Sequence, residues 1–297
     1  MLAALDGALE DMRLSTAPPY SLARTLASGQ CFRWTLDHGS ARGIVDGTVA
    51  RVAQRTRHLV VSWDGPRRSA ARLRRHLGAD QPLAAIEATL VRDRVLRRLL
   101  PMTSGIALMR QDPWECLVSY VVSAFNNIPK IVQSIEHLAR RFGQRVEGTD
   151  GVVDAWTFPT PDRLADASVA ALSKCSLGYR GPYVRALARE VACGKSDLGR
   201  VASLPYDDAR RALLEYPGVG EKVADCVLLY GFGHRQAFPV DVWIQRAVER
   251  WYFGGRQQTP RAIRAWARDR FGETAGYAQQ HLYAGARAVM RGSPSQP

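Results

Sequence analysis

The chain has 297 residues with an ordinary hydrophobic fraction of 46%, which allows two domains with real cores and excludes global disorder. Its formal net charge of +13 favours a polyanionic partner, because Lys and Arg displace counterions from a phosphate backbone. The apolar runs fall short of 18 residues and the acidic N-terminus has no basic leader, so we expect neither membrane insertion nor secretion.

Short runs rich in β-branched and aromatic residues fill the segment from 30 to 63, separated by Gly and Asp turns. They predict an antiparallel meander with one covered face. The expected strands are 30–34, 42–47, 48–54 and 57–63. A basic helix should follow, and residues 81–100 have apolar positions at helical spacing.

From Gly105 the pattern becomes helical. The sequence Asp-Pro-Trp-Glu at 112–115 is a strong helix start, and we expect Leu117, Val121 and Phe125 on the buried face of that helix. A second helix should begin at Pro129. Further helices are expected near 161–175, 182–193, 207–216, 221–231, 241–252, 260–270 and 274–291.

These patterns predict an α+β protein. We expect an N-terminal β-rich domain at 1–104, a mostly helical domain at 105–291 and a loose tail at 292–297, with the active site in the cleft between the two domains. The 5 Cys are scattered and the 6 His show no ligand spacing. We therefore expect free thiols in a reducing compartment and no structural metal.

The most informative stretch runs from Leu214 to Asp241. Pro217 should end one helix, and Gly218 and Gly220 allow a tight reversal before the next. The unpaired amides that open the next helix form a ready anion site. An ordinary helix–helix turn uses the same chemistry, but the basic composition favours contact with a phosphate.

Lys222 falls in the first turn of that next helix, where the dipole disfavours a cation by roughly 0.3–1 kcal/mol. The same field, with desolvation, favours the neutral amine that a nucleophile requires. Asp241 is expected to cap the following helix and to hold or deprotonate the amine. We predict that the two form a catalytic pair. The plainer alternatives are an exposed Lys that touches phosphate and a simple capping Asp.

The segments PGVGEKVADC at 217–226 and PVDVW at 239–243 resemble the helix-hairpin-helix (HhH-GPD) DNA glycosylase superfamily, specifically its 8-oxoguanine DNA glycosylase/AP lyase branch. Four other segments resemble that branch in the same order. They are SGQCFRW at 28–34, ALMRQDPWECLVSYVVSAFNN at 107–127, LGYRGPYV at 177–184 and YAQQHLY at 277–283.

This resemblance implies a chemistry. Lys222 would attack the anomeric carbon of the damaged nucleotide and leave a Schiff base, and Asp241 would assist. β-Elimination would then nick the strand. The implied partner is double-stranded DNA that contains oxidised guanine, bound by a monomer without a membrane. No redox cofactor is implied, although carbonyls of the hairpin could hold a monovalent cation. A protein of this kind belongs in a prokaryotic cytoplasm or nucleoid, or in a eukaryotic nucleus.

The resemblance also assigns base-reading residues. Gly29 matches the glycine whose carbonyl senses the proton that distinguishes 8-oxoguanine from guanine. Gln279 and Tyr283 lie four apart on one helix face and match the residues that contact the base edge and stack on the base. Cys226, one turn after Lys222, could line the base pocket. Plainer alternatives exist for each residue. Gly29 could simply form a turn before the first strand, Gln279 and Tyr283 could pack in the core, and Cys226 could be a buried structural thiol.

Other residues match positions that contact DNA. Tyr179 resembles the wedge that fills the space left by a flipped base, Arg180 resembles the reader of the opposite strand, and Asn126 falls near the gap. Gly218 and Gly220 would approach the phosphate backbone. The plainer reading of Tyr179 and Arg180 is a solvated loop pair.

Three departures from the animal members of the branch stand out. Phe125-Asn126-Asn127 replaces three consecutive Asn, Lys130 replaces an Arg, and Trp243 replaces a His two residues after the catalytic Asp. The first two weaken the expectation of strict selection for cytosine opposite the lesion. Trp243 would alter a phosphate or pocket contact.

Two alternatives remain for the function. An alkylation-type monofunctional glycosylase on the same fold would use water in place of a Lys and would not nick the strand. A non-catalytic helix-hairpin-helix DNA-binding module would need the hairpin and the charge, but not Lys222, Asp241 and Gly29 together. The scattered Cys exclude the form of endonuclease III that carries an iron–sulfur cluster.

Overall fold

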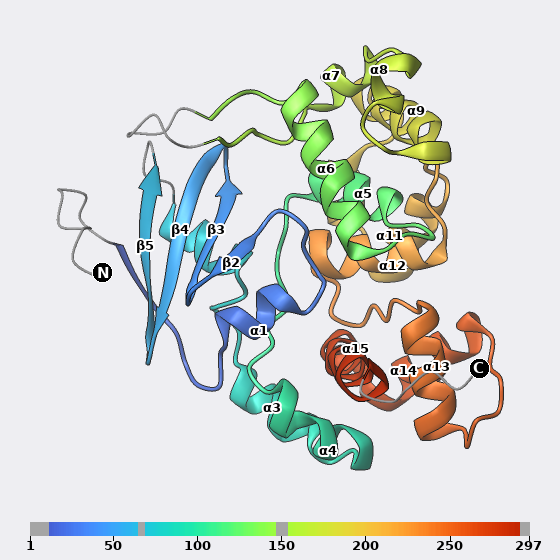
Figure 1. Ribbon diagram of the computed structural model, residues 1–297. Coiled ribbons are helices and arrows are strands. Elements are labelled where there is room, and N and C mark those ends of the chain that lie inside the picture. The colour runs from blue at the N-terminus through green and yellow to red at the C-terminus, as the bar shows by residue number, and fades with distance from the viewer. Residues whose placement is uncertain (1–11, 65–68, 147–153, 292–297) are drawn as a thin grey trace.

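The computed structural model describes residues 12–64, 69–146 and 154–291. The acidic start of the chain and the tail expected at 292–297 lie outside these residues. An N-terminal antiparallel sheet is followed by a succession of helices, so the expected α+β architecture is confirmed (Figure 1). Within the described residues, every helix is too short or too polar to span a bilayer.

The sheet has five strands in the order β1-β5-β4-β3-β2. Consecutive strands from β2 to β5 pair antiparallel, which confirms the expected meander. In β5 the side chains of Leu59, Val61 and Trp63 are buried and alternate with more exposed positions, so one face of the sheet is covered. The strands are β1 (Met12–Ser15), β2 (Thr35–Asp37), β3 (Ser40–Val45), β4 (Thr48–Arg55) and β5 (His58–Asp64).

The strand expected at 30–34 is wrong, because the first strand of the meander begins only at Thr35. The side chain of Gln30 explains the difference. It is fully buried, donates to the carbonyl of Ala107 at 2.8 Å and accepts from the amide of Met109 at 2.8 Å. This segment is therefore bound to the start of the helical region and not to the sheet. Strand β1 and helix α1 (Leu22–Ala27) were not expected, since both are short.

The helices follow the expected order, with local differences. The apolar stretch at 81–100 forms two helices, because Asp93 caps a new one through the amides of Val95 and Leu96. The stretch at 161–175 is likewise two short helices. The early helices are α2 (Ala70–His76), α3 (Leu83–Leu90), α4 (Arg94–Thr103), α5 (Pro113–Val122), α6 (Ile128–Phe142), α7 (Pro161–Ala165) and α8 (Val169–Ser173).

The later helices carry most of the candidate site residues. The helix expected at 221–231 begins as α12 and continues as a π-helix, η2 (Leu228–Phe232). Helix α10 was not expected. The remaining elements are η1 (Gly178–Arg180), α9 (Gly181–Ala192), α10 (Leu198–Ser203), α11 (Tyr206–Leu214), α12 (Glu221–Val227), α13 (Val242–Tyr252), α14 (Pro260–Phe271), η3 (Gly272–Thr274) and α15 (Ala275–Arg291).

Helix α5 begins as expected, with Asp112 accepting from the amide of Glu115 and Pro113 in the first turn. Its end differs from the expectation. Leu117 and Val121 are buried, but the helix stops at Val122, and Phe125 is 99% exposed. The apolar spacing predicts a buried Phe only if the helix continues. The left-handed backbone of Phe125, with φ of 49°, ends that spacing.

The C-terminal helix α15 contacts segments from the first third of the chain. It packs against α4, where His281 and Thr103 share a hydrogen bond of 2.8 Å between Nδ1 and Oγ1. One residue earlier, Gln280 donates from Nε2 to the carbonyl of Ser28 at 2.9 Å. The loop that carries Gly29 is therefore fixed by a helix at the far end of the sequence.

A substitution in the helical core should separate packing from surface effects. We expect Leu138→Ala in α6, where the side chain is fully buried, to lower the free energy of unfolding by about 2–5 kcal/mol. Val132→Ala on the same helix, where Val132 is 40% exposed, should change it by no more than about 0.5 kcal/mol. Urea denaturation of both variants measures the difference, and equal losses would contradict the assignment of the buried face.

Candidate active site

Helix α12 is held by charged side chains on one of its faces. Asp225 is fully buried and accepts from Nε of Arg210 at 2.9 Å. Glu221, one turn earlier, pairs with Arg264 of α14 at 2.8 Å. Residues four apart share a face of a helix, so Lys222 and Cys226 lie together on a neighbouring stripe. The ion pairs with α11 and α14 thus set the direction in which Lys222 points.

The Lys222 amine lies against the end of α5. Its Nζ donates to Oγ of Ser123 at 2.8 Å and lies 4.9 Å from the centre of the Tyr120 ring. The Ser123 hydroxyl donates in turn to the carbonyl of Tyr120 at 2.7 Å, so its lone pairs remain for the lysine. Lys222 is only partly exposed. The amine is therefore held in a defined place and does not extend freely into solvent.

Asp241 caps α13, as the sequence predicts. Its carboxylate accepts from the amide of Ile244 at 2.8 Å. Burial raises the pKa of Asp241 above its ordinary value of 3.8, although the bond from Ile244 and the positive charge of Lys222 act in the opposite direction. A carboxylate with a raised pKa is a better proton acceptor near neutral pH.

Cys226 lies within the electrostatic reach of this pair. Burial raises the pKa of its thiol to about 12. The positive charge of Lys222 acts to lower this pKa, and the negative charge of Asp241 acts to raise it. The thiol is therefore neutral and is suited to line a pocket, not to act as a nucleophile. The structure thus brings Lys222, Asp241 and Cys226 together, while the assignment of Cys226 to a base pocket stays a prediction.

Gly29 occupies a backbone conformation that favours glycine, with φ of +84°. A Cβ atom there would lie 3.2 Å from Cε1 of Tyr283 and 3.5 Å from a guanidinium nitrogen of Arg287. Tyr283 is partly exposed, and the Arg287 guanidinium lies 5.6 Å from its ring centre. Gly29 and Tyr283, predicted separately from distant segments, are therefore neighbours.

Gln279 is buried one turn before Tyr283. Its Oε1 accepts from the hydroxyl of Tyr230 at 3.3 Å, and its Nε2 donates to the carbonyl of Pro239 at 3.3 Å. Both bonds are long, and the stronger bond of Tyr230, at 2.6 Å, goes to Gln280. The side-chain amide of Gln279 therefore makes only weak hydrogen bonds, one of them to Pro239, which lies two residues before Asp241. The contact of Gln279 with a base stays a prediction.

Several residues that shape the site were not identified from the sequence. Ser123 and Tyr120 hold Lys222, and the Tyr120 hydroxyl donates to the carbonyl of Gln30 at 3.0 Å. The sequence signal that could have identified them is the presence of the polar residues Tyr120 and Ser123 in and just after the apolar end of α5. Asp225 and its arginine partner Arg210 gave no signal, because they lie 15 residues apart on different helices.

A third group surrounds the end of α5. Tyr179 is 57% exposed, and its hydroxyl donates to the carbonyl of Ala124 at 3.3 Å. Arg180 is turned inward and only 7% exposed; its guanidinium donates to the carbonyls of Ala124 and Phe125. Asn126 donates to the carbonyl of Val122 at 3.2 Å. Reading of the opposite strand by Arg180 stays a prediction and would require these bonds to open.

The hairpin before α12 has the expected reversal. Gly218 has φ of +76°, and a Cβ there would lie 2.8 Å from Cβ of Tyr183, so the turn packs against α9. Gly220 is exposed at the start of α12 with open space around it. Trp243 is partly exposed in the first turn of α13. Phosphate contacts at these positions stay predictions.

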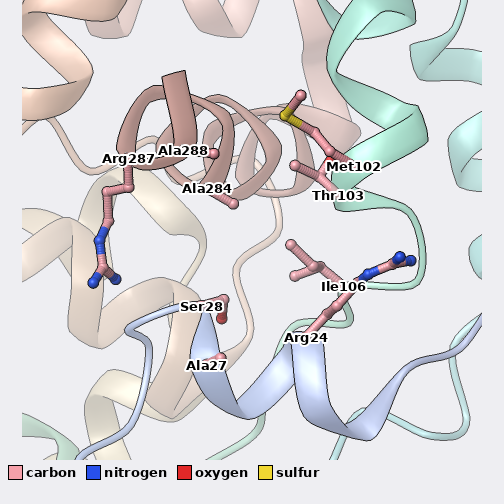
Figure 2. A pocket seen from close by; sticks show the side chains of 9 residues that line it. All are labelled: Arg24, Ala27, Ser28, Met102, Thr103, Ile106, Ala284, Arg287 and Ala288. Carbon is pink, nitrogen blue, oxygen red and sulfur yellow. The ribbon is translucent and has the colours of Figure 1, made fainter. Parts of the chain in front are cut away.

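A cavity of about 460 Å³ lies between α1, the end of α4 and α15 (Figure 2). Ser28 and Ala284 lie on its walls, and Arg24 and Arg287 flank it. It adjoins the loop of Gly29 but is lined by neither Lys222 nor Asp241. Among the described residues, His, Cys, Asp and Glu side chains form no cluster of three that could hold a metal ion.

Comparison with known proteins adds an independent observation. The family described as "HhH-GPD superfamily base excision DNA repair protein" matches residues 118–272. The family described as "8-oxoguanine DNA glycosylase, N-terminal domain" matches residues 14–117. The chain is 37% identical to the "Probable N-glycosylase/DNA lyase" of Methanothermobacter thermautotrophicus over 219 residues, which cover 67% of this chain and 69% of that protein.

Two solved structures have the same fold over nearly the whole chain. MBOgg1 in complex with a low-affinity DNA ligand is 33% identical, with a TM-score of 0.90 and coverage of 96% of this chain and 98% of the other. The Clostridium acetobutylicum 8-oxoguanine glycosylase/lyase, solved with double-stranded DNA that contains cytosine opposite 8-oxoguanine, is 29% identical. Its TM-score is 0.86, with coverage of 91% and 93%.

The raised pKa of Asp241 has a consequence for stability. A carboxyl with a higher pKa in the folded state binds its proton there first, so stability falls as pH rises through that window. Asn caps a helix as well as Asp and carries no charge. We therefore expect Asp241→Asn to raise the melting temperature at pH 7, and this gain to shrink as pH falls toward 3.8.

Thermal denaturation at pH 7 and near pH 4 measures this effect. A lower melting temperature for Asp241→Asn at pH 7, or a gain of equal size at both pH values, would show that burial of this charge does not destabilise the protein.

Proposed function

Because the chain belongs to the HhH-GPD superfamily of base excision DNA repair proteins, we propose that it removes 8-oxoguanine from double-stranded DNA and nicks the strand through a covalent intermediate on Lys222. The observation that carries this proposal is the placement of the Lys222 amine. It is held by Ser123 at 2.8 Å within the electrostatic reach of the half-buried carboxyl of Asp241.

The first chemical step is nucleophilic substitution. The amine nitrogen of Lys222 forms a bond to the anomeric carbon, while the bond from that carbon to the base nitrogen breaks and its electron pair leaves with the base. The base takes up a proton from water as it departs. Asp241 is an anion at the start and stabilises the positive charge that develops on the sugar; it then receives the proton that the amine loses.

The covalent intermediate allows strand cleavage. The ring oxygen of the sugar leaves the anomeric carbon with its electron pair and becomes a hydroxyl by taking up the proton that Asp241 received. The lysine nitrogen then becomes part of a protonated imine. Loss of a proton from the adjacent sugar carbon then expels the 3′ phosphate, which nicks the strand. Water hydrolyses the imine and releases the lysine. A glycosylase that uses water as its nucleophile cannot carry out these steps, because attack by water forms no imine that could promote elimination.

Access to the sugar requires the damaged nucleotide to leave the base stack, which costs a few kcal/mol. In our proposal Tyr283 stacks on the extruded base, Gln279 contacts its edge, and the carbonyl of Gly29 accepts the proton that guanine lacks. The adjacency of Gly29 and Tyr283 supports this assignment. The hairpin at Gly218 and Gly220 and the start of α13 hold the phosphate backbone.

The proposed reaction needs no redox cofactor. Carbonyl oxygens of the hairpin are the groups that would hold a monovalent cation near the DNA backbone. We propose that the enzyme acts as a monomer on the genome, in the cytoplasm or nucleoid of a prokaryote or the nucleus of a eukaryote. The net charge of +13 suits this polyanionic substrate.

Reduction with borohydride during incubation with a duplex that contains one 8-oxoguanine tests the covalent step. We expect a stable protein–DNA adduct with the wild type and none with Lys222→Gln, because only an imine is reduced to a permanent bond. Lys195→Gln is the matched control, since Lys195 is an exposed partner of Glu190 and should not change the yield. An adduct that persists in Lys222→Gln would assign the covalent bond to another amine.

A substitution at Gly29 should separate base recognition from strand cleavage. Gly29→Ala introduces strain of roughly 1–3 kcal/mol and a methyl group beside Tyr283, so we expect excision of 8-oxoguanine to fall roughly 10- to 100-fold. Cleavage at a preformed abasic site should be nearly unchanged, because no base enters the pocket. Single-turnover rates on the two duplexes measure this separation.

Gly39→Ala is the matched control, since Gly39 has the same positive φ and open space around it. Loss of both activities to the same extent in Gly29→Ala alone would indicate damage to the catalytic pair and would remove Gly29 from base recognition.

A further inference from the structure

The hydroxyl of Tyr277, in the first turn of α15, is a buried polar group that the reaction on Lys222 does not use. Tyr277 is only 1% exposed, and its hydroxyl makes no hydrogen bond within the part of the chain that the structure describes. A buried tyrosine hydroxyl ordinarily has a partner, because it has given up its bonds with water. Burial raises the pKa of Tyr277 to about 12, so the hydroxyl keeps its proton and can donate to an acceptor.

Tyr277 lines a small recess together with Arg110, Gly233 and Arg235. The recess has a volume of about 10 Å³, which is enough for one oxygen atom the size of a water molecule. Gln81 also lines it, but both polar atoms of its side chain are engaged. Its Nε2 donates to the carbonyl of Leu108 at 2.6 Å, and its Oε1 accepts from the amide of Leu108 at 3.0 Å. Gln81 therefore does not serve as the acceptor for Tyr277.

The guanidinium of Arg110 is fixed beside this recess. It donates to the carbonyl of Phe232 at 3.0 Å and lies across the backbone of Gly233, where any Cβ atom would overlap it. The main-chain amide of Arg110 donates to the carbonyl of His76 at 3.0 Å. Among the described residues, the bond to Phe232 is the one hydrogen bond of this guanidinium. Its other N–H groups are therefore left to donate to a further acceptor.

Positive charges gather at this place without a matching anion. Burial and the charges of Arg235 and Arg75 lower the pKa of Arg110. Asp80 acts in the opposite direction, but within residues 12–64, 69–146 and 154–291 neither Arg110 nor Arg235 forms an ion pair. Arginine carries donors only, and the protonated hydroxyl of Tyr277 also needs an acceptor. All three side chains thus require the same kind of partner, a negatively charged oxygen.

We propose that Arg110, Arg235 and Tyr277 form a binding site for an oxyanion, either inorganic phosphate or the phosphate group of a larger molecule. One oxygen of the anion enters the recess and accepts from the hydroxyl of Tyr277, and the two arginines donate to the remaining oxygens in charge-assisted hydrogen bonds. Tyr277 and Gln279 are two residues apart, which is a rotation of about 200° around α15. The oxyanion site therefore lies on the opposite side of this helix from Gln279, and its existence does not depend on the proposed function.

An anion at this position would connect three segments that are distant in the sequence. Arg110 precedes α5, Arg235 precedes α13, and Tyr277 belongs to α15. The neighbours of Arg110 hold the segment after Gly29, because the amide of Met109 donates to Oε1 of Gln30 at 2.8 Å and Nε2 of Gln111 donates to the Gln30 carbonyl at 2.6 Å. Binding of the anion should therefore stabilise the folded protein.

Thermal denaturation in potassium phosphate and in potassium chloride, at pH 7 and equal ionic strength, tests the site. We expect phosphate to raise the melting temperature of the wild type in a saturable way, by about 2–4 °C at ten times its dissociation constant. Tyr277→Phe keeps the ring and removes the hydroxyl. It should melt at or above the wild type in chloride, since that hydroxyl has no partner there, and should bind phosphate at least about tenfold more weakly.

Three further variants test the charges. Arg235→Gln, at an exposed position, should lose most of the rise in phosphate, whereas Arg163→Gln, which removes the same charge from an exposed position on α7, should keep it. Asp80→Asn should bind phosphate more tightly, because it removes the opposing anion. The inference is overturned if the wild type melts alike in the two salts, if Tyr277→Phe keeps the full rise, or if Arg163→Gln loses as much as Arg235→Gln.

A binding measurement identifies the source of the phosphate group. The affinity of the wild type and of Tyr277→Phe for a short undamaged duplex is compared at constant salt. Equal affinities would assign the site to free phosphate or a nucleotide, and weaker binding by Tyr277→Phe would assign it to the backbone of DNA. Lys222→Gln should keep the whole rise in phosphate, so failure of the proposed reaction and failure of the oxyanion site are separate results.

Discussion

The fixed position of α12 is the constraint on which the site depends. Glu221 and Asp225 lie on one face of this helix and pair with arginines from α11 and α14. Asp225 is fully buried, so removal of its partner Arg210 would leave a charge without compensation, which commonly destabilises a protein by several kcal/mol. The helix is therefore locked in rotation, and Lys222 on the neighbouring stripe must face Ser123 and Tyr120 at the end of α5.

The same region shows that chemistry and stability have different requirements. The proposed reaction requires Asp241 as a charged or proton-accepting group, yet burial opposes its ionised form. Phe125 is exposed and strained, although a polar residue or glycine there would suit the free protein better. Natural proteins depart from local rules of this kind mainly at functional positions. Both departures lie near Lys222, because Phe125 follows Ser123, the partner of Lys222, by two residues and Asp241 lies within the electrostatic reach of Lys222.

Local signals in the sequence predicted the elements that local interactions decide. The caps at Asp112 and Asp241, the reversal at Gly218 and the meander all follow from short patterns, and they are present. The strand expected at 30–34 failed because a distant partner competes: Gln30 binds Ala107 and Met109 in place of a neighbouring strand. The exposure of Phe125 and the inward direction of the Arg180 side chain likewise depend on long-range hydrogen bonds, which the Arg180 guanidinium donates to the carbonyls of Ala124 and Phe125.

The bond between Gln280 and Ser28 has a consequence for how the protein is made. It joins residues 252 positions apart, and Tyr283 reaches Gly29 across a similar separation. Contacts of such long range form late, because the intervening chain must be synthesised and ordered first. A nascent chain on the ribosome can form its sheet and the helix of Lys222, but the contacts of Gly29 and Ser28 with α15 cannot form until α15 has been translated. A polypeptide interrupted before α15 would thus lack Gln279 and Tyr283, the residues to which the proposed function assigns contact with the damaged base.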